Sequence, residues 1–318
     1  MKAVVIYRPG GPDELILEER PVPQIKKGWS RVKIKGFGVN HSEIFTRKGL
    51  SPGVGFPRVL GIECVGVIDA TTDPVRLPEG QKVISIMGEM GRAFDGSYEE
   101  YALIPNEQIY PVATGLSWEN LAAVPETYYT AYGSMLNLRI GSSDEVLVRG
   151  AASGVGVAFA RLLRAQYGNL RLTGTSRSLN KSGYLKNVGY DEVIQDRDGR
   201  LQTPRSYDRI LELIGPATLH DSFSHTKPGG IVCSTGELGG VWNIDLEPIQ
   251  ELPANGYLTS FYSGNVSEEK VNEMLAFIEE RHVNAAPERV FSLENVADAH
   301  RYLEGGHSFG KAVVLCGE

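Results

Sequence analysis

Hydrophobic and polar positions alternate in short runs over the first third of the chain. From Met1 to about Ile109, β-branched segments stand between Gly and Pro turn signals, among them AVVIY, RVKIKGFGV and QKVISI. Runs of this length and composition are typical of strands. One stretch, NHSEIFTRKG between Asn40 and Gly49, has instead the polar start and the glycine stop of a short helix. The pattern predicts a compact, mostly-β unit that contains one short helix.

After Trp118 the pattern changes to longer helical periods that alternate with apolar strands. Two helical stretches are ENLAAVPETYYTAYGSML and VGVAFARLLRAQYG, and the strands include EVLVRGA, LRLTGTS, DRILELI and GGIVCSTG. Alternation of helix and strand predicts a parallel sheet with helices on both faces, here of about six strands.

The tail, from about Ser267, offers a charged amphipathic helix, a second helix and a final strand, KAVVLCG. We expect this tail to pack back onto the first unit. A chain of 318 residues is also longer than one average domain. We therefore predict one domain from residues 1–120 and 265–318, and a second from 121–264.

The composition of the chain limits the classes of partner that it can bind. The chain is 42% hydrophobic and 22% charged, its net charge is -7, and it has no dense basic run. These values are typical of a globular protein and argue against nucleic acid as a partner. Charged residues, glycine and proline occur within the first twelve residues, which is too early for the apolar region of a secretory leader. No apolar stretch is long enough to span a membrane. We expect a cytoplasmic protein without membrane segments.

Cysteine and histidine spacing gives no metal motif. Cys64, Cys233 and Cys316 are far apart in sequence, so we expect three reduced, buried thiols and no zinc site built from close pairs. The histidines form no spaced pair suited to a metal, and we expect structural or surface roles for all six: His41, His220, His225, His282, His300 and His307.

The sharpest motif is EVLVRGAASGVGVAFARLLRA, in which an apolar strand runs into a small-residue loop and then into a helix. Such a loop can approach a pyrophosphate, whose charge is met by the free N–H groups of the helix. This predicts cofactor contacts at Ser153, Gly154 and Val155. Ala151 and Ser153 replace the first two glycines of the usual fingerprint, so a generic turn that needs small residues for packing remains the alternative.

A second segment bears on the choice of cofactor. About twenty residues past Gly156, NAD-binding folds place an Asp or Glu on the ribose, whereas this chain has Ser176, Arg177 and Ser178, with Lys181 one turn later. A guanidinium and an ammonium would hold a 2′-phosphate. We predict NADP(H), with a solvated charged face as the alternative.

Together these segments resemble the medium-chain dehydrogenase/reductase superfamily, and within it the zinc-free quinone oxidoreductase and enoyl reductase branch. The resemblance spans nearly the whole chain and rests on GFGVNHSEIFTRKG, PRVLGIECVGVI, GSYEEYALIP, PETYYTAYGSM, GAASGVG and SFGKAVVL. It implies an α/β protein with a GroES-like, mostly-β catalytic domain and a doubly wound, parallel-sheet Rossmann domain.

The resemblance also bears on zinc. The zinc-dependent alcohol dehydrogenases of this superfamily have Cys at the place of Asn40, and Gly-His-Glu where this chain has Gly61, Ile62 and Glu63. Both changes remove metal ligands, and the stretch 87–101 has none of the cysteines of the family's structural zinc lobe. Without two of its three protein ligands a catalytic zinc loses its usual site, so the resemblance implies a zinc-free member.

Catalytic roles follow only from this resemblance. Asn40 is expected beside the nicotinamide, where its amide could bind a substrate carbonyl. Phe45 holds the place of a Tyr found in many quinone oxidoreductases, which removes one proton donor. Tyr128 and its neighbour Tyr129 are expected near the same cleft, with a structural role as the alternative.

The resemblance places further cofactor contacts along the chain. Thr130 matches a residue near the nicotinamide ribose, and the remaining positions lie in loops at the carboxyl ends of strands or at the return to the first domain. They are Leu213, Ile214, Gly236, Phe261, Gly310 and Lys311. Core or hinge packing is the alternative for Phe261, and a surface charge is the alternative for Lys311.

The resemblance and the motifs predict a homodimeric, NADPH-dependent reductase that transfers hydride to a quinone or an α,β-unsaturated carbonyl. Such electrophilic small molecules accept hydride without a metal, because their carbonyl spreads the charge. The dimer would form through edge strands between residues 236 and 262. One rival is a nucleotide-binding protein with a structural role and little catalysis. The others are a zinc dehydrogenase and an alcohol dehydrogenase-like protein that lacks zinc and has another substrate class.

Overall fold

The computed structural model describes residues 1–306 and 308–317, so His307 lies outside the described residues. The chain forms two compact units, and each is built from more than one segment. Unit 1 contains Met1–Glu126, Ser263–Glu279 and Ala285–Glu318, and unit 2 contains Thr127–Tyr262 and Glu280–Asn284.

In its described part, unit 1 has one sheet of seven strands and one of three. The larger sheet has the order β16-β17-β3-β5-β6-β8, with β7 also on β3, and the smaller has the order β2-β1-β4. Their strands are β1 Lys2–Ile6, β2 Leu15–Glu19, β3 Trp29–Val39, β4 Arg58–Val59, β5 Glu63–Ala70, β6 Lys82–Ile86, β7 Tyr101–Pro105, β8 Tyr110–Pro111, β16 Arg289–Ser292 and β17 Ala312–Leu315. The mostly-β unit is thus confirmed.

The centre of unit 1 is β3, which alternates buried and half-buried residues and pairs with β5, β7 and β17. Its Phe37 ring stacks on Tyr98 at 4.8 Å between centroids. The strand leads through Asn40 into α1, His41–Arg47, the short helix that the sequence predicts. Asn40 therefore stands where the central strand ends and a helix begins.

Short helical turns and helices complete unit 1. They are η1 Pro12–Glu14, η2 Asn106–Gln108, α2 Trp118–Ala122, η4 Leu293–Asn295 and α9 Val296–Glu304. The expected long helix between 119 and 136 is wrong in one respect, because it breaks into α2 and α3, Pro125–Leu138. The break precedes Pro125, whose missing N–H is tolerated at the first helical position.

The described residues of unit 2 form one sheet of seven strands, in the order β12-β11-β10-β9-β13-β14-β15. Six are parallel, as predicted, and the two-residue β12 adds an antiparallel edge that the sequence pattern did not indicate. The strands are β9 Glu145–Arg149, β10 Arg171–Ser176, β11 Glu192–Arg197, β12 Arg200–Leu201, β13 Tyr207–Glu212, β14 Thr226–Ser234 and β15 Tyr257–Ser260.

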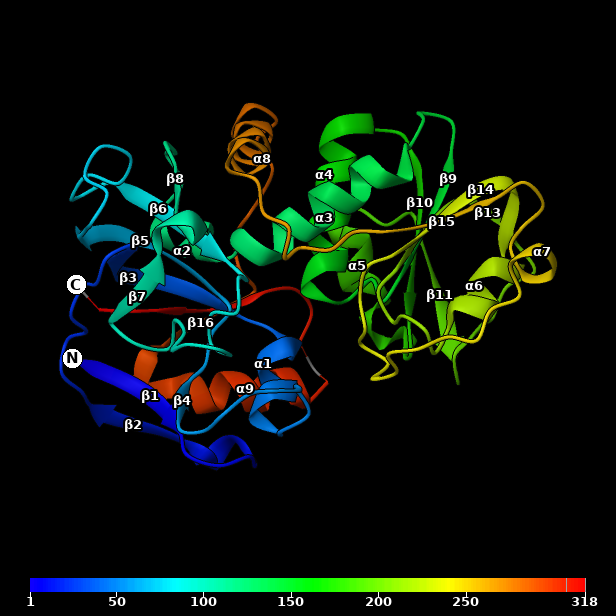
Figure 1. The fold of residues 1–318 in the computed structure, drawn as a ribbon. Coiled ribbons are helices and arrows are strands. Elements are labelled where there is room, and N and C mark those ends of the chain that lie inside the picture. The colour runs from blue at the N-terminus through cyan, green and yellow to red at the C-terminus, as the bar shows by residue number, and fades with distance from the viewer. Residues whose placement is uncertain (307, 318) are drawn as a thin grey trace. The chain divides into compact units, whose positions relative to one another are not determined.

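Helices cover both faces of this sheet, with α4 and α5 on one side and α6 and α7 on the other (Figure 1). They are α4 Gly154–Tyr167, η3 Leu179–Lys181, α5 Ser182–Val188, α6 Leu219–Ser224 and α7 Pro248–Glu251. From β9 the chain continues to β10 and β11 on one side, and it later returns to β13 and β14 on the other side of β9. The loops that follow β9 and β13 therefore lead away from each other at the carboxyl ends of these two adjacent strands. This is the position where doubly wound sheets bind nucleotides.

The tail follows the expected course. It contains α8, Glu268–Glu280, then β16 and α9, and finally β17, which pairs antiparallel with β3. The final strand β17 therefore joins the larger sheet of unit 1, whereas the segment Glu280–Asn284 belongs to unit 2. Among residues 1–306 and 308–317, no helix combines the length and the apolar character that a bilayer crossing needs.

Candidate functional site

The small-residue loop of unit 2 adopts the strand–loop–helix geometry that its sequence predicts. Ser153 caps α4, because its hydroxyl accepts a hydrogen bond from the Gly156 amide at 3.1 Å. A Cβ on Gly156 would lie 2.6 Å from the Ala151 carbonyl oxygen, so only glycine allows this close approach. The cap leaves the amides of Gly154 and Val155 at the helix start for an anion.

A second loop lies at the end of the neighbouring strand β13. The buried Glu212 carboxylate accepts hydrogen bonds from the amides of Ile214, at 2.8 Å, and Gly215, at 3.1 Å. A Cβ on Gly236 would lie 2.3 Å from the Leu213 carbonyl oxygen. The loops after β13 and β14 are therefore packed together, which fixes Leu213, Ile214 and Gly236 beside the first loop on the sheet edge.

The segment predicted to hold a 2′-phosphate follows β10. Ser176 ends this strand, and its hydroxyl donates to the Ser178 carbonyl at 2.8 Å. The Arg177 side chain is exposed and makes no ion pair among the described residues, while Lys181 ends η3. An uncommitted guanidinium at the carboxyl end of a strand is available to an anionic ligand.

Sequence reasoning missed a buried charge network below these loops. Arg149, fully buried at the end of β9, contacts three carboxylates: Asp196 at 2.7 Å, Asp221 at 2.9 Å and Glu212 at 3.9 Å. It also donates to the Gly199 carbonyl at 2.7 Å. Because Glu212 in turn holds the loop after β13, this arginine connects the core of the sheet to the candidate cofactor loops.

The aromatic positions of unit 2 are engaged in packing. The buried Tyr128 hydroxyl donates to the Asn284 carbonyl at 2.9 Å, and burial raises its pKa. Phe261 lies 5.7 Å from Tyr129 between ring centroids. It also fills the space beside α3 that a Cβ on Gly133 would need. These contacts favour the structural alternative for Tyr128 and Phe261. Thr130 is buried on the same helix.

A buried polar cluster in unit 1 gathers Asn40 and Lys311. The Lys311 ammonium donates to Asn40 Oδ1 and to Glu63 Oε1, both at 2.6 Å. Asn40 Nδ2 donates to Glu63 Oε1 at 2.8 Å and to Glu43 Oε1 at 3.3 Å. Both hydrogens and the oxygen of the Asn40 amide thus have partners within the protein. The lysine comes from the turn after Gly310, whose φ is +121°.

The glycine on β3 explains how the lysine fits. A Cβ on Gly38 would lie 2.1 Å from Lys311 Cε and 2.3 Å from Glu63 Oε1. Glu63 is fully buried, and its second oxygen accepts from the Glu126 amide at 2.7 Å. The carboxylate is therefore held by three donors and carries the compensating charge for the lysine.

Glu43, on α1, is the residue of this cluster that sequence reasoning missed. It is buried, and its Oε2 has no hydrogen-bond partner among the described residues. Burial raises the pKa of this carboxyl to about 8, although Lys311 lowers it and Glu63 raises it further. At neutral pH Glu43 is then mostly protonated. Residue 45, two positions later on α1, is a phenylalanine, so its side chain has no polar atom.

Glu43→Gln tests this protonation state. The folded carboxyl, with a pKa of about 8, keeps a proton that the unfolded chain loses near its ordinary value of 4.5. The wild-type free energy of unfolding should therefore fall as pH rises between these values, whereas the neutral glutamine adds no such fall. In urea unfolding, the stability of the wild type relative to that of the variant should fall by about 4 kcal/mol between pH ~4.5 and pH ~8.5. Parallel pH curves for the two proteins would contradict the assignment.

The residues of this cluster do not fit zinc. Within residues 1–306 and 308–317, no three or more His, Cys, Asp or Glu side chains are grouped as a metal site. The position that a cation would need is next to Glu63 and Asn40, and the Lys311 ammonium contacts both. A positive side chain there opposes a divalent cation.

The three cysteines and His300 are buried side chains. All three cysteines are free and buried, as expected, and burial raises the pKa of Cys64 and of Cys316, the latter to about 12. The buried His300 accepts or donates at 2.9 Å to the Tyr98 hydroxyl, and burial lowers its pKa to about 3. This histidine is therefore neutral and structural.

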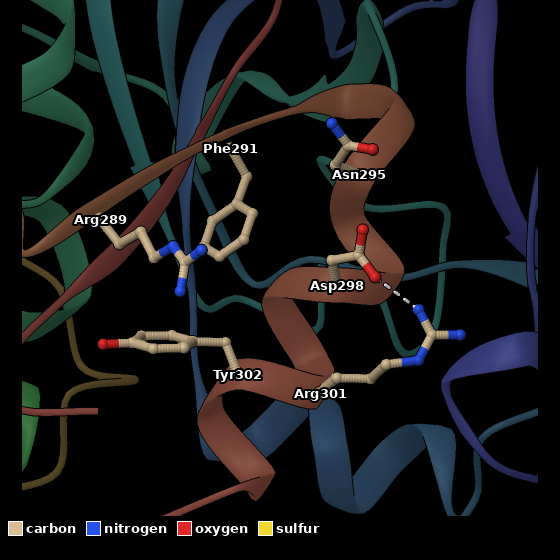
Figure 2. A pocket seen from close by; sticks show the side chains of 6 residues that line it. All are labelled: Arg289, Phe291, Asn295, Asp298, Arg301 and Tyr302. Atoms are coloured by element: carbon tan, nitrogen blue, oxygen red, sulfur yellow. Dashed lines mark hydrogen bonds and ion pairs between the residues drawn. The ribbon is translucent and has the colours of Figure 1, made fainter. Parts of the chain in front are cut away.

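A surface hollow of about 480 Å³ lies between β16 and α9 of unit 1 (Figure 2). Its lining residues are Arg289, Phe291, Asn295, Asp298, Arg301 and Tyr302. The Arg289 guanidinium lies 4.7 Å from the Tyr302 ring centroid, and Arg301 pairs with Asp298 at 2.6 Å. None of the residues predicted for the site lines this hollow.

Comparisons with known proteins agree with this architecture. Residues 26–114 match the alcohol dehydrogenase GroES-like domain, and residues 188–314 match the zinc-binding dehydrogenase family. The human quinone oxidoreductase is 26% identical and aligns over 99% of this chain and 98% of its own length. The zebrafish (Danio rerio) synaptic vesicle membrane protein VAT-1 homolog is 24% identical over 98% of this chain and 69% of its own.

The solved structures show the same fold. The yhdH oxidoreductase from Salmonella enterica, solved in complex with NADP, has a TM-score of 0.85 at 20% identity, with 99% of each chain covered. The two family matches, the human quinone oxidoreductase that aligns over nearly its whole length, and the topologies of the two sheets all agree. The chain therefore belongs to the medium-chain dehydrogenase/reductase superfamily, as a zinc-free member of the quinone oxidoreductase type.

Proposed function

We propose that this protein is an NADPH-dependent reductase that transfers hydride to a quinone or to the β-carbon of an α,β-unsaturated carbonyl compound. The observation that carries the proposal is the loop from Gly150 to Gly154. It joins a parallel strand to a capped helix whose first amides are available to a pyrophosphate. The membership of an oxidoreductase superfamily supports the reaction class.

Residues of unit 2 would hold the nucleotide. Gly154 and Val155 would bind the pyrophosphate, and the loops at Leu213 and Gly236 would line the nicotinamide side. Arg177 and Lys181 would bind the 2′-phosphate, which favours NADP(H) over NAD(H). The bound cofactor would supply the hydride.

The unit 1 cluster supports the proposed class of acceptor. Zinc relatives polarise an alcohol with a metal, but here a lysine ammonium, a neutral acid and an amide share that place. Quinones and enones need less polarisation, because their own conjugation spreads the charge of the incoming hydride. We therefore propose electrophilic acceptors rather than simple alcohols.

A homodimer is part of the proposal. The strand β15 is the outer strand of the described unit 2 sheet, with Tyr257 58% and Leu258 38% exposed. An exposed, partly apolar edge strand is a pairing site for a second copy.

NADPH consumption with two acceptors tests the function. Purified protein should oxidise NADPH, followed by its absorbance, in the presence of 9,10-phenanthrenequinone and of a simple enone, and more slowly with NADH. NADPH binding without turnover on either acceptor would favour the rival, a nucleotide-binding protein with little catalysis. If the protein bound no NADPH, both the reductase and the nucleotide-binding rival would be contradicted.

A further inference from the structure

The Asn40 amide is fully engaged within the protein, which changes the expected catalytic group. Its two hydrogens go to Glu43 and Glu63, and its oxygen accepts from Lys311. To bind a substrate carbonyl, Asn40 would first have to break one of these bonds. A different donor in the cluster is better placed for that role.

The Lys311 ammonium uses two of its three N–H groups in hydrogen bonds among the described residues. An ammonium carries three N–H groups, and two are used by Asn40 and Glu63. The third has no partner among residues 1–306 and 308–317. The side chain is only 7% exposed, so a third bond from this ammonium would form in a poorly hydrated place, where a charged donor is strongest.

Its surroundings fix this charge in one position. Gly38 leaves room for the lysine chain, and Glu63 neutralises it without reaching the third N–H. Glu43 is mostly neutral at pH 7, so the charges of the cluster are the positive one on Lys311 and the negative one on Glu63. A fixed cation of this kind is preorganised for an oxygen on which negative charge develops.

We propose that Lys311 is the residue that binds the acceptor's carbonyl oxygen, stabilises the oxyanion formed on hydride transfer, and then protonates it. The proposal rests on the reductase function proposed above and names a proton donor for a chain that has Phe45 in place of the family tyrosine. Asn40 and Glu63 then act as positioning residues for the ammonium.

The step balances for an enone. The β-carbon receives hydrogen with its electron pair, the C=C π pair forms the new Cα=C bond, and the carbonyl π pair moves to oxygen. One Lys311 N–H proton passes to that oxygen, which gives the enol, and the enol tautomerises to the saturated ketone. Water returns a proton to the Lys311 amine.

Lys311→Met tests the role by its effect on two acceptors. Removing a preorganised oxyanion donor should lower kcat/KM about 10²-fold or more for an enone. We expect a smaller loss for the intrinsically more electrophilic quinone. General misfolding would lower both equally. Lys27→Met, which removes an exposed lysine of unit 1, should leave both rates unchanged.

Two further variants separate charge from folding. Lys311→Met with Glu63→Gln removes both charges and so avoids an unpaired buried carboxylate, yet should share the enone defect. Gly38→Ala keeps all charges but would place a Cβ 2.1 Å from Lys311 Cε, so it should reproduce the defect by moving the lysine.

A binding measurement tests Lys311 without turnover. 4-Nitrophenol mimics the oxyanion, and its colour reports its ionisation. With wild-type protein and NADP⁺ we expect the pKa of the bound phenol to fall by about one unit or more, and with Lys311→Met to fall much less.

Equal ionisation in the two proteins, or no binding of the phenolate by wild type, would overturn the assignment. So would equal rate losses for both acceptors in a folded Lys311→Met variant. If wild type reduces neither acceptor but still ionises the phenol through Lys311, the proposed reaction fails while the oxyanion site stands.

Discussion

Replacing Arg149 with Met is expected to lower the free energy of unfolding by about 3–5 kcal/mol, because it leaves buried carboxylates without their cation. Asp196, Glu212 and Asp221 all contact this guanidinium, and Glu212 is fully buried. Burial already raises the pKa of Glu212, and Arg149 opposes that rise. Chemical denaturation followed by circular dichroism would measure the loss.

The control for this variant is an arginine on the same sheet. Arg171, at the start of β10, pairs with Glu145 at 2.8 Å, but its side chain is 61% exposed. Surface pairs of this kind contribute about 0–1 kcal/mol, so Arg171→Met should change stability little. If Arg149→Met were as stable as Arg171→Met, the network would not hold the cofactor loops as described.

The second large effect concerns the cofactor. Arg177→Asp should weaken NADPH binding about 10²-fold or more, since it replaces a partner of the 2′-phosphate by a repelling charge. Binding of NADH, which lacks that phosphate, should change little. Calorimetric titration of both nucleotides into the variant would measure the shift in preference.

Arg171→Asp gives the matching control, because it makes the same charge change at the opposite end of β10, away from the nucleotide edge. It should weaken both nucleotides equally or not at all. An Arg177→Asp variant that retains the wild-type preference for NADPH would show that Arg177 belongs to a solvated face instead.

The sequence was sufficient wherever the signal is local. The strand, the turn and the helix around Ser153 are continuous in the chain, and the cap needs only the amide of Gly156 three residues later. The strand alternation of β3 and the short helix α1 are equally local. The two-domain α/β fold could therefore be predicted from periodicity and from the family resemblance.

The charge networks could not be predicted, because their partners are remote in sequence. Lys311 and Glu63 are 248 positions apart, and Arg149 and Asp196 are 47 apart. Sequence carries no register for such pairs. A weak signal did exist, since Arg149 follows three consecutive apolar residues in its strand and Glu43 adjoins buried Ile44. A charge in an apolar run needs a buried partner, but the pattern does not say which one.

The most direct test of the central claim follows the hydride itself. The protein would be given NADPH that carries deuterium at C4 of the nicotinamide, on either face in turn, together with an enone. One of the two labelled cofactors should deliver deuterium to the β-carbon of the saturated ketone, as seen by NMR. Consumption of NADPH with no deuterium in the ketone from either cofactor would contradict reduction by direct hydride transfer.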